Sequence, residues 1–176
     1  MVGIRTQPTC LRWFLILYIS IWSSGDSQMS FDRQRIVAIM KENCLHAYLA
    51  TTHGNQPFVR PVSPIVEDDM TIWLTTFSTS RKVSHICDNP KMCLAFVEQP
   101  QGDKAVFVFG EAHIVSDIEK KKKVWQLARF DLWQHFPDGP ESKEFCLLAI
   151  TPKRIEWRES WETGNKMLEP TWVERG

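Results

Sequence analysis

The sequence has no excess of charge of either sign, because 21 Lys and Arg residues balance 21 Asp and Glu residues. A balanced chain creates no general field that attracts nucleic acid or an anionic membrane, so we predict neither as a partner. Collagen-like, solenoid and heptad repeats are also missing. The chain is rich in apolar residues: 43% are hydrophobic, and 8 of these are Trp. This content suffices for a globular core and excludes disorder of the whole chain.

The cysteines and histidines lack the spacings of metal sites. The five Cys residues form no CxxC pair, and the five His residues form no i, i+4 pair on one helix face, so we predict no metal site. We expect four of the cysteines to be small buried side chains, with reactive or bridged thiols as the alternative. Free buried thiols favour a reducing compartment. These four are Cys44, Cys87, Cys93 and Cys146.

Residues 1–28 differ from the rest of the chain. Arg5 and Arg12 are followed by an apolar run over 13–22, which is shorter than the roughly 20 residues needed to cross a bilayer. The segment is therefore either a signal peptide or a stretch ahead of an internal start at Met29, and we favour the second. A cytoplasmic protein follows from that choice, and an exported one from the other.

The remaining chain is interpreted as one domain over residues 29–160 with a tail over 161–176. Alternating apolar residues predict six strands, and helical spacing predicts three helices, of which the first and third are capped at Ser30 and Ser116. Antiparallel strands with peripheral helices indicate a small β-barrel of class α+β. The expected strands are 46–52, 57–67, 70–76, 91–97, 105–115 and 145–157, and the expected helices are 31–43, 80–89 and 117–133.

Proline and glycine mark the irregular positions in these strands. Pro61 and Pro64 predict that the second strand is an edge strand or contains a bulge, because proline donates no ladder hydrogen bond. Gly110 interrupts the fifth strand, and Thr151 with Pro152 allows a bulge in the sixth.

The stretch from Thr75 to Lys82 carries the clearest chemical signal. A strand ends at Thr75 and Thr76, and a Ser- and Thr-rich loop leads into a helix at Ser80, Arg81 and Lys82. Free amides at a helix N-terminus, hydroxyl groups and two cations together suit a terminal phosphate. The alternative is an ordinary capped surface helix whose Arg and Lys are only solvated.

Arg60 supports the phosphate interpretation. A hairpin about Asp68 would place Arg60 opposite Thr76, at the same end of the strands as the helix. Three cations at one point repel one another unless an anion binds between them. The sequence therefore predicts an anion site that includes Arg60.

Two further features have structural interpretations. His85 lies one turn beyond Lys82, and we expect it to be a solvated helix residue. The run from Lys120 to Lys123 is expected to be a solvated helix face rather than a nucleic-acid contact, because apolar residues surround it at helical spacing.

Several of these segments together resemble the pyridoxamine 5′-phosphate oxidase-like family of FMN-binding split-barrel proteins, and in particular its general-stress-protein branch. The resemblance covers almost all of residues 30–160 and implies a six-stranded antiparallel split β-barrel. The matching segments are Arg60-Pro-Val-Ser, Trp73-Leu-Thr-Thr-Phe-Ser-Thr-Ser-Arg-Lys-Val-Ser-His-Ile, Asn89-Pro-Lys-Met-Cys-Leu, Phe109-Gly-Glu-Ala-His-Ile-Val-Ser-Asp and Ile150-Thr-Pro-Lys-Arg-Ile-Glu-Trp.

This resemblance implies a homodimer with FMN at each end of the subunit interface. By matching position, four residues would bind the FMN phosphate: Arg60, Ser80, Arg81 and Lys82. Four others would lie along the ribityl chain and flavin ring, largely through backbone groups: Val62, Ser63, Thr75 and Thr76. No residue is assigned as catalytic, because flavin chemistry resides in the cofactor.

The chain also departs from the oxidase pattern. The oxidase has a C-terminal Arg-x-His segment that binds the substrate phosphate, whereas this chain has Ser160-Trp-Glu-Thr-Gly-Asn-Lys. Pyridoxamine phosphate oxidation is therefore not expected. The leading hypothesis is an FMN-dependent oxidoreductase acting on an unknown small molecule. The alternatives are a non-catalytic FMN carrier or stress sensor, and a protein that binds haem or a deazaflavin in the same cleft.

Overall fold

The structure is a computed structural model that describes residues 29–170, and the chain divides into two compact units, Met1–Arg35 and Ile36–Gly176. The leader proposed over residues 1–28 lies outside the described residues. Residues 29–42 are helical, so Ser30 is inside the helix and is not its N-cap. From residue 36 onward this helix belongs to the second unit, where Ile36 and Met40 are fully buried.

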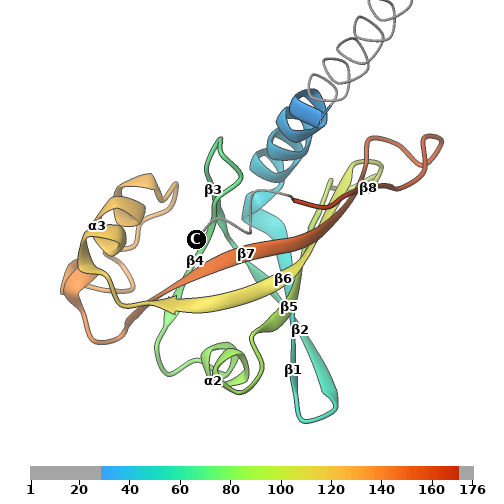
Figure 1. Cartoon of the computed structure of the whole chain (residues 1–176). Helices are drawn as coiled ribbons and strands as arrows, with labels where there is room; N and C mark the ends of the chain where they lie inside the picture. Colours follow the sequence, from blue (N-terminus) through green and yellow to red (C-terminus); the bar gives the residue numbers. More distant parts are fainter. Residues whose placement is uncertain (1–28, 171–176) are drawn as a thin grey trace, which may run out of the picture. The chain divides into compact units, whose positions relative to one another are not determined.

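The described part of the second unit is an antiparallel, curled sheet with peripheral helices (Figure 1), which confirms the predicted α+β split-barrel class. The strand order is β2-β1-β5-β6-β7-β4-β3, and β8 pairs with β7. The strands are β1 (Ala47–His53), β2 (Gln56–Val62), β3 (Ile65–Val66), β4 (Ile72–Phe77), β5 (Lys91–Val97), β6 (Ala105–Val115), β7 (Phe145–Arg158) and β8 (Lys166–Leu168). The helical elements are η1 (Cys44–His46), α2 (Arg81–Asp88), α3 (Ile118–Leu127) and η2 (Gly139–Glu141).

The eight strands in residues 29–170 exceed the six expected because the second extended run divides and β8 is added. The run breaks at Ser63 and Pro64, so its first part is β2 and its last part is β3. β2 pairs with β1, which puts Arg60 opposite Leu49, and the short β3 pairs with β4. The predicted hairpin that placed Arg60 opposite Thr76 is therefore wrong. β2 is an edge strand, as its prolines predicted.

The two longest strands, β6 and β7, are joined through a bulge at Gly110. The register shifts between Phe109 and Gly110, which pair with Arg154 and Pro152, so the intervening Lys153 has no partner. A Cβ atom at Gly110 would lie 2.1 Å from the backbone oxygen of Thr151. The predicted irregularity is confirmed, and close backbone approach is the reason that the position holds glycine.

The helix α3 begins and ends differently from the prediction. Its N-cap is Asp117, whose carboxylate accepts hydrogen bonds from the amides of Glu119 and Lys120, so Ser116 is not the cap. The helix ends at Leu127 rather than near Trp133. An Asp side chain is as good an N-cap as Ser, and the sequence alone did not separate the two positions.

The sheet is covered on both faces near β4 and β7. Trp73 and Leu147 belong to one apolar cluster with Trp125 of α3, whereas their neighbours Leu74 and Leu148 belong to the larger cluster that contains the helix residues 36–40. Successive side chains of a strand point to opposite faces, which explains the alternation. This double covering holds β4 in place, and β4 leads into α2.

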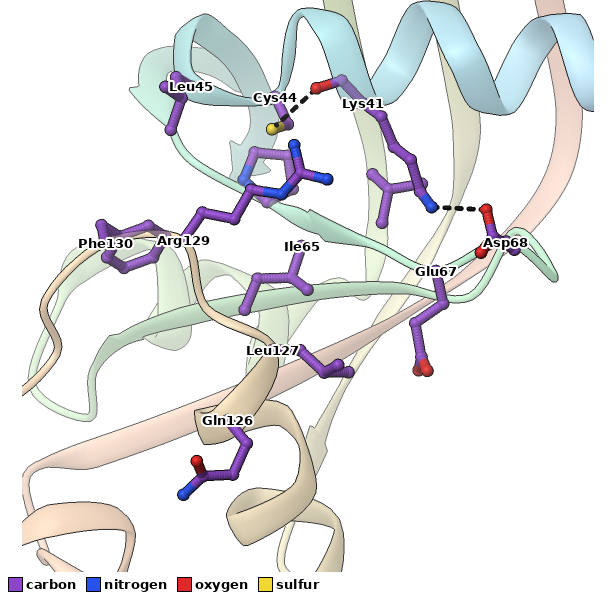
Figure 2. A pocket seen from close by; sticks show the side chains of 12 residues that line it. Lys41, Cys44, Leu45, Ile65, Glu67, Asp68, Gln126, Leu127, Arg129 and Phe130 are labelled. Carbon is purple, nitrogen blue, oxygen red and sulfur yellow. Dashed lines mark hydrogen bonds and ion pairs between the residues drawn. The ribbon is translucent and has the colours of Figure 1, made fainter.

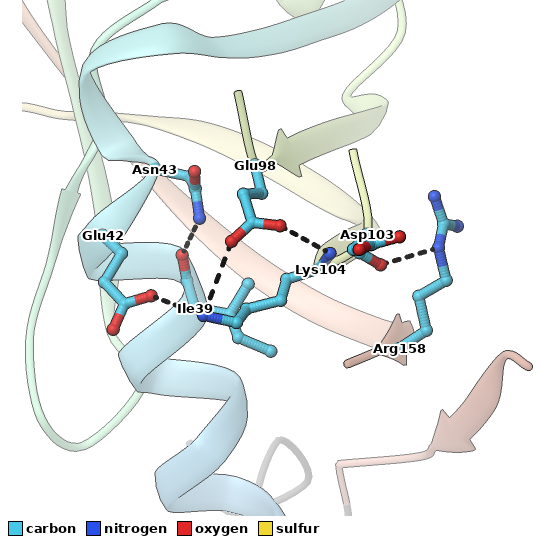
Figure 3. A network of polar contacts seen from close by, with 7 residues as sticks. All are labelled: Ile39, Glu42, Asn43, Glu98, Asp103, Lys104 and Arg158. Carbon is cyan, nitrogen blue, oxygen red and sulfur yellow. Dashed lines mark hydrogen bonds and ion pairs between the residues drawn. The ribbon is translucent and has the colours of Figure 1, made fainter. Parts of the chain in front are cut away.

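The start of the predicted tail is attached to the sheet. Arg158 is only 6% exposed, and it donates hydrogen bonds to the backbone oxygens of Gly102 (3.0 Å) and Asp103 (3.1 Å). Its guanidinium lies 3.7 Å from the ring centroid of Trp161. Figure 3 shows Arg158 reaching Asp103, next to Lys104. These contacts join the end of β7 to the loop between β5 and β6.

The cysteines only partly follow the prediction of buried thiols. Cys44 and Cys146 are buried and Cys93 is half-buried, but Cys87 is exposed on α2, so that prediction was wrong for Cys87. All four are free. Burial raises the pKa of the Cys93 thiol to about 11, which keeps it protonated at neutral pH. Within residues 29–170, no helix has the length and apolar character needed to cross a membrane.

Candidate functional site

Three cations approach one another where β2 lies near the start of α2. Burial and the nearby Arg81 lower the pKa of Arg60, and burial and the nearby Arg60 lower the pKa of Lys82. Within the described residues, none of the three forms an ion pair with a carboxylate. We call Arg60, Arg81 and Lys82 the cationic cluster. Their mutual repulsion would be relieved by a bound anion.

Lys82 is held by hydroxyl groups at the end of β4. Its Nζ donates a hydrogen bond to Thr76 Oγ1 at 2.8 Å, and Thr76 Oγ1 lies 3.3 Å from Ser80 Oγ. Thr76 is buried, so its position is fixed by the sheet. Thr76, Ser80 and Lys82 are therefore joined by side-chain contacts, although the sequence analysis assigned Thr76 to the flavin rather than to Lys82.

The N-terminus of α2 has free backbone donors. Ser80 is the N-cap, and its carbonyl accepts hydrogen bonds from the amides of Val83 (2.9 Å) and Ser84 (3.4 Å). The amides of Arg81 and Lys82 have no acceptor among residues 29–170. Free amides and the positive end of the helix dipole thus lie beside two members of the cationic cluster.

Arg60 is tied to β1 by one nitrogen. Its Nη1 donates to Thr51 Oγ1 at 2.7 Å and is 3.5 Å from the backbone oxygen of Leu49. Its other side-chain nitrogens have no hydrogen-bond partner in the described part of the chain. The free edge of the guanidinium is thus available to an anion in a planar, two-bonded geometry.

His85 is buried, at 5% exposure, so the prediction of a solvated helix residue was wrong. α2 packs against β1, and the hairpin of β1 and β2 covers the face of α2 that carries His85. Its Nδ1 lies 3.0 Å from Thr51 Oγ1, the same hydroxyl that contacts Arg60. Sequence spacing placed His85 one turn from Lys82 but gave no indication of this covering.

Three other residues predicted to contact the flavin take no part in the hydrogen bonds of the cationic cluster. Val62 ends β2 and packs against the core, and Ser63 Oγ donates to the backbone oxygen of Leu45 at 3.3 Å. Thr75 is half-buried in β4, opposite Leu147. None of the three is hydrogen-bonded to the cationic cluster in residues 29–170, so their contacts with a flavin stay predictions.

A cavity of about 370 Å³ opens next to Ser63, and sequence reasoning did not find it. Figure 2 shows Arg129 extending over Ile65 toward Cys44. The cavity walls come from η1, the β3 segment, the end of α3 and the loop after it, which are far apart in the sequence. No local motif could therefore have indicated it.

The charges around this cavity are compensated except at one residue. Lys41 is paired with Asp68 at 2.6 Å, and Glu67 accepts from Trp73 Nε1 at 2.7 Å as well as from a lysine of α3. Arg129 has no ion pair in the part of the chain that the structure describes. The cavity lining is thus about equally polar and apolar, with one positive charge that has no ion-pair partner in residues 29–170.

The lysine run and the histidines add no second site. Lys122 is paired with Glu141 at 3.1 Å and Lys123 with Glu67 at 2.8 Å, so part of the run is used in contacts within the domain. These ion pairs raise the pKa of both lysines. Among residues 29–170, no group of His, Cys, Asp and Glu has the arrangement of a metal site.

Comparisons with known proteins agree with this fold. A crystal structure of a NimC/NimA family protein from Clostridium acetobutylicum is similar, with a TM-score of 0.67 and 20% identity over 81% of this chain and 96% of that one. General Stress Protein 26 from Bacillus anthracis str. Sterne has a TM-score of 0.63 and 19% identity, over 78% and 98% of the two chains. A heme binding protein from Mycobacterium smegmatis has a TM-score of 0.63 and 12% identity, over 78% of this chain and 57% of that one.

At these identities, structural similarity shows the fold alone. No curated protein sequence matches this chain. The sequence profile described as pyridoxamine 5′-phosphate oxidase does match, and the match spans residues 34–158, which include every element from η1 to β7. The chain therefore belongs to the pyridoxamine 5′-phosphate oxidase family.

Proposed function

We propose that this protein binds FMN and acts as an oxidoreductase on a small molecule. The observation that carries the proposal is the cationic cluster: three positive side chains without a carboxylate partner among the described residues, beside free helix amides. This set of donors fits a phosphate monoester, which has several acceptor oxygens and up to two negative charges. Family membership makes a flavin phosphate the first candidate.

In this proposal, the residues of the site divide between the two ends of the flavin. Arg60, Ser80, Arg81 and Lys82 hold the phosphate, and Thr76 orients Lys82. Val62, Ser63 and Thr75 lie along the ribityl chain and ring. When bound, FMN supplies the electron-transfer chemistry, and the chain's own residues bind it, orient it and limit access of water.

The cavity beside Ser63 is the proposed place for the substrate. Its walls begin at Pro64 and Ile65, directly after the residues assigned to the flavin ring. The uncompensated charge of Arg129 favours a substrate that is anionic, and the mixed polar and apolar lining favours one that has both polar groups and apolar surface. Pyridoxamine phosphate is not proposed, because Ser160–Lys166 lack the Arg-x-His segment of the oxidase.

The proposed function is tested with the purified full-length protein. A yellow protein with flavin absorbance, reduced by NADH or NADPH and reoxidised with turnover by an added acceptor, is the expected result. Tight FMN binding without turnover on any acceptor would instead favour the carrier or sensor. A haem Soret band without flavin would contradict the FMN assignment. Haem binding is the alternative suggested by the similar fold of the heme binding protein.

We also predict that the protein is a homodimer in solution. Arg60 lies in the edge strand β2, and Ser63 directly follows that strand, so a flavin bound there would be half exposed in one subunit. A second subunit would cover it. Sedimentation velocity should give twice the mass of the 176-residue chain, and a monomer that retains its flavin would contradict the prediction.

A further inference from the structure

Arg60, Thr51 and His85 form a hydrogen-bonded chain across three elements. Arg60 Nη1 and Thr51 Oγ1 are 2.7 Å apart, and Thr51 Oγ1 and His85 Nδ1 are 3.0 Å apart. Arginine has only donors, so the Thr51 oxygen must accept from Arg60. In the tautomer of His85 that carries its proton at Nε2, Nδ1 accepts the single hydrogen of the Thr51 hydroxyl.

The ring of His85 is held in one orientation by aromatic neighbours from the hairpin. It is stacked on His53, with ring centroids 5.1 Å apart and an interplanar angle of 13°, and it contacts Phe58 at 4.7 Å. His53 is in turn paired with Asp88, at the end of α2, at 3.1 Å. These contacts leave His85 little freedom to turn away from Thr51.

The electrostatic surroundings of His85 favour its neutral form, the form in which Nδ1 can accept a hydrogen bond from Thr51. Burial lowers the pKa of His85 below its ordinary value, and Arg60, His53 and Arg81 lower it further, against an opposing effect of Asp88. Neutral His85 adds no positive charge to the cationic cluster, and its Nδ1 lone pair remains an acceptor.

We propose that His85 is a positioning residue for the phosphate site, which acts through Thr51 to fix the guanidinium of Arg60. This inference rests on the proposed function and deepens it, because it assigns the origin of selectivity for a phosphorylated flavin. One nitrogen of Arg60 is held by Thr51, so the free edge of the guanidinium is oriented before the ligand arrives. A donor that is oriented in advance loses less side-chain freedom on binding, which raises the affinity. Only a ligand with a phosphate contacts this donor, so only such a ligand binds more tightly because of it.

The test compares FMN with riboflavin, which lacks the phosphate, on full-length apoprotein. His85→Leu removes the acceptor, whereas His85→Asn keeps one at the δ position. His85→Leu is expected to raise the Kd for FMN about tenfold, the effect of one lost hydrogen bond, and to leave the Kd for riboflavin unchanged. His85→Asn should restore FMN affinity to within about threefold of the unmodified protein.

Two further variants separate positioning from general structural damage. Thr51→Val should weaken FMN binding as much as His85→Leu, and the double variant should be no weaker than either single one, because both break the same chain. His113→Leu, at an exposed histidine of β6, should have no effect. Thermal melting of each apoprotein checks folding.

The outcomes distinguish the two proposals. If the unmodified protein binds FMN no better than riboflavin, both the phosphate site and the role of His85 are wrong. If it prefers FMN but His85→Leu weakens both ligands equally, or His85→Asn is as weak as His85→Leu, the phosphate site stands and the positioning role is overturned.

Discussion

Replacing Lys82 with alanine is expected to weaken FMN binding by about 1–3 kcal/mol, and replacing Arg81 with alanine should do the same. That is a loss of about 5- to 150-fold in affinity. Each change removes one charged donor from the cationic cluster. No carboxylate of residues 29–170 pairs with these cations, so their charge is available to the phosphate. Titration of apoprotein with FMN, followed by quenching of flavin fluorescence, measures the effect.

Lys120→Ala is the matched control, because it removes one positive charge from exposed α3, outside the cluster. It should leave FMN affinity unchanged. If both Lys82→Ala and Arg81→Ala also bind FMN with unchanged affinity, the assignment of these residues to the phosphate is wrong.

Lys82→Ala should not lower the melting temperature of the apoprotein. Because burial and Arg60 lower the pKa of Lys82, the unfolded chain binds the proton more tightly than the folded one. The unfavourable effect of this charge on folding therefore develops as the pH falls from the unfolded pKa near 10.5 through the lower folded pKa, and at neutral pH the charge opposes folding. A site that costs stability without its ligand is typical of binding sites.

Replacing Gly110 with alanine is the second change with a large expected effect, here on folding. The added Cβ would lie 2.1 Å from the backbone oxygen of Thr151 and 3.1 Å from the Cα of Pro152, and backbone cannot move aside as a flexible side chain can. The bulge between β6 and β7 would have to open. We expect a loss of about 3 kcal/mol or more in the free energy of unfolding.

Gly164→Ala is the control for this prediction. Gly164 has a φ of +65° but no atom within 4 Å of its Cβ position, so only its left-handed backbone opposes alanine. The cost should be about 1–2 kcal/mol. Denaturant unfolding of both variants gives the comparison, and a Gly110→Ala protein as stable as Gly164→Ala would show that the bulge tolerates a side chain.

Local patterns were sufficient for α2, which carries part of the site, and for the strands β5 and β6. The boundaries of β5 and β6 follow from alternation and turn residues, and Ser80 and Asn89 bound α2 because they cap it at either end. The irregularity at Gly110 was predictable because glycine in a strand marks close backbone approach. In each case the decisive interactions lie within a few residues of one another.

Pairing was harder to predict, since the run containing Arg60 is compatible with two hairpins. The turn at Gly54 leads to pairing with β1, and the turn near Asp68 leads to pairing with β4. The break at Ser63 and Pro64 lets each half follow its own turn. Arg60 still reaches the start of α2, because α2 packs against β1, the partner of β2. The predicted hairpin was thus the wrong route to the start of α2, and binding of an anion by these cations stays a prediction.

Features that depend on distant packing could not be found from the sequence. His85 is buried because a hairpin formed some 30 residues earlier covers it. The cavity near Arg129 needs η1, β3 and the end of α3 together. The thiol of Cys87 is exposed because another face of α2 packs against β1, and the sequence does not show which face that is.

The most direct test of the central claim compares the affinities of FMN and riboflavin for unmodified apoprotein at low ionic strength. These ligands share the ring and ribityl chain and differ only in the phosphate. The cationic cluster predicts that FMN binds at least about 100-fold more tightly, as expected for two or more charged hydrogen bonds. Equal dissociation constants for the two flavins would contradict it.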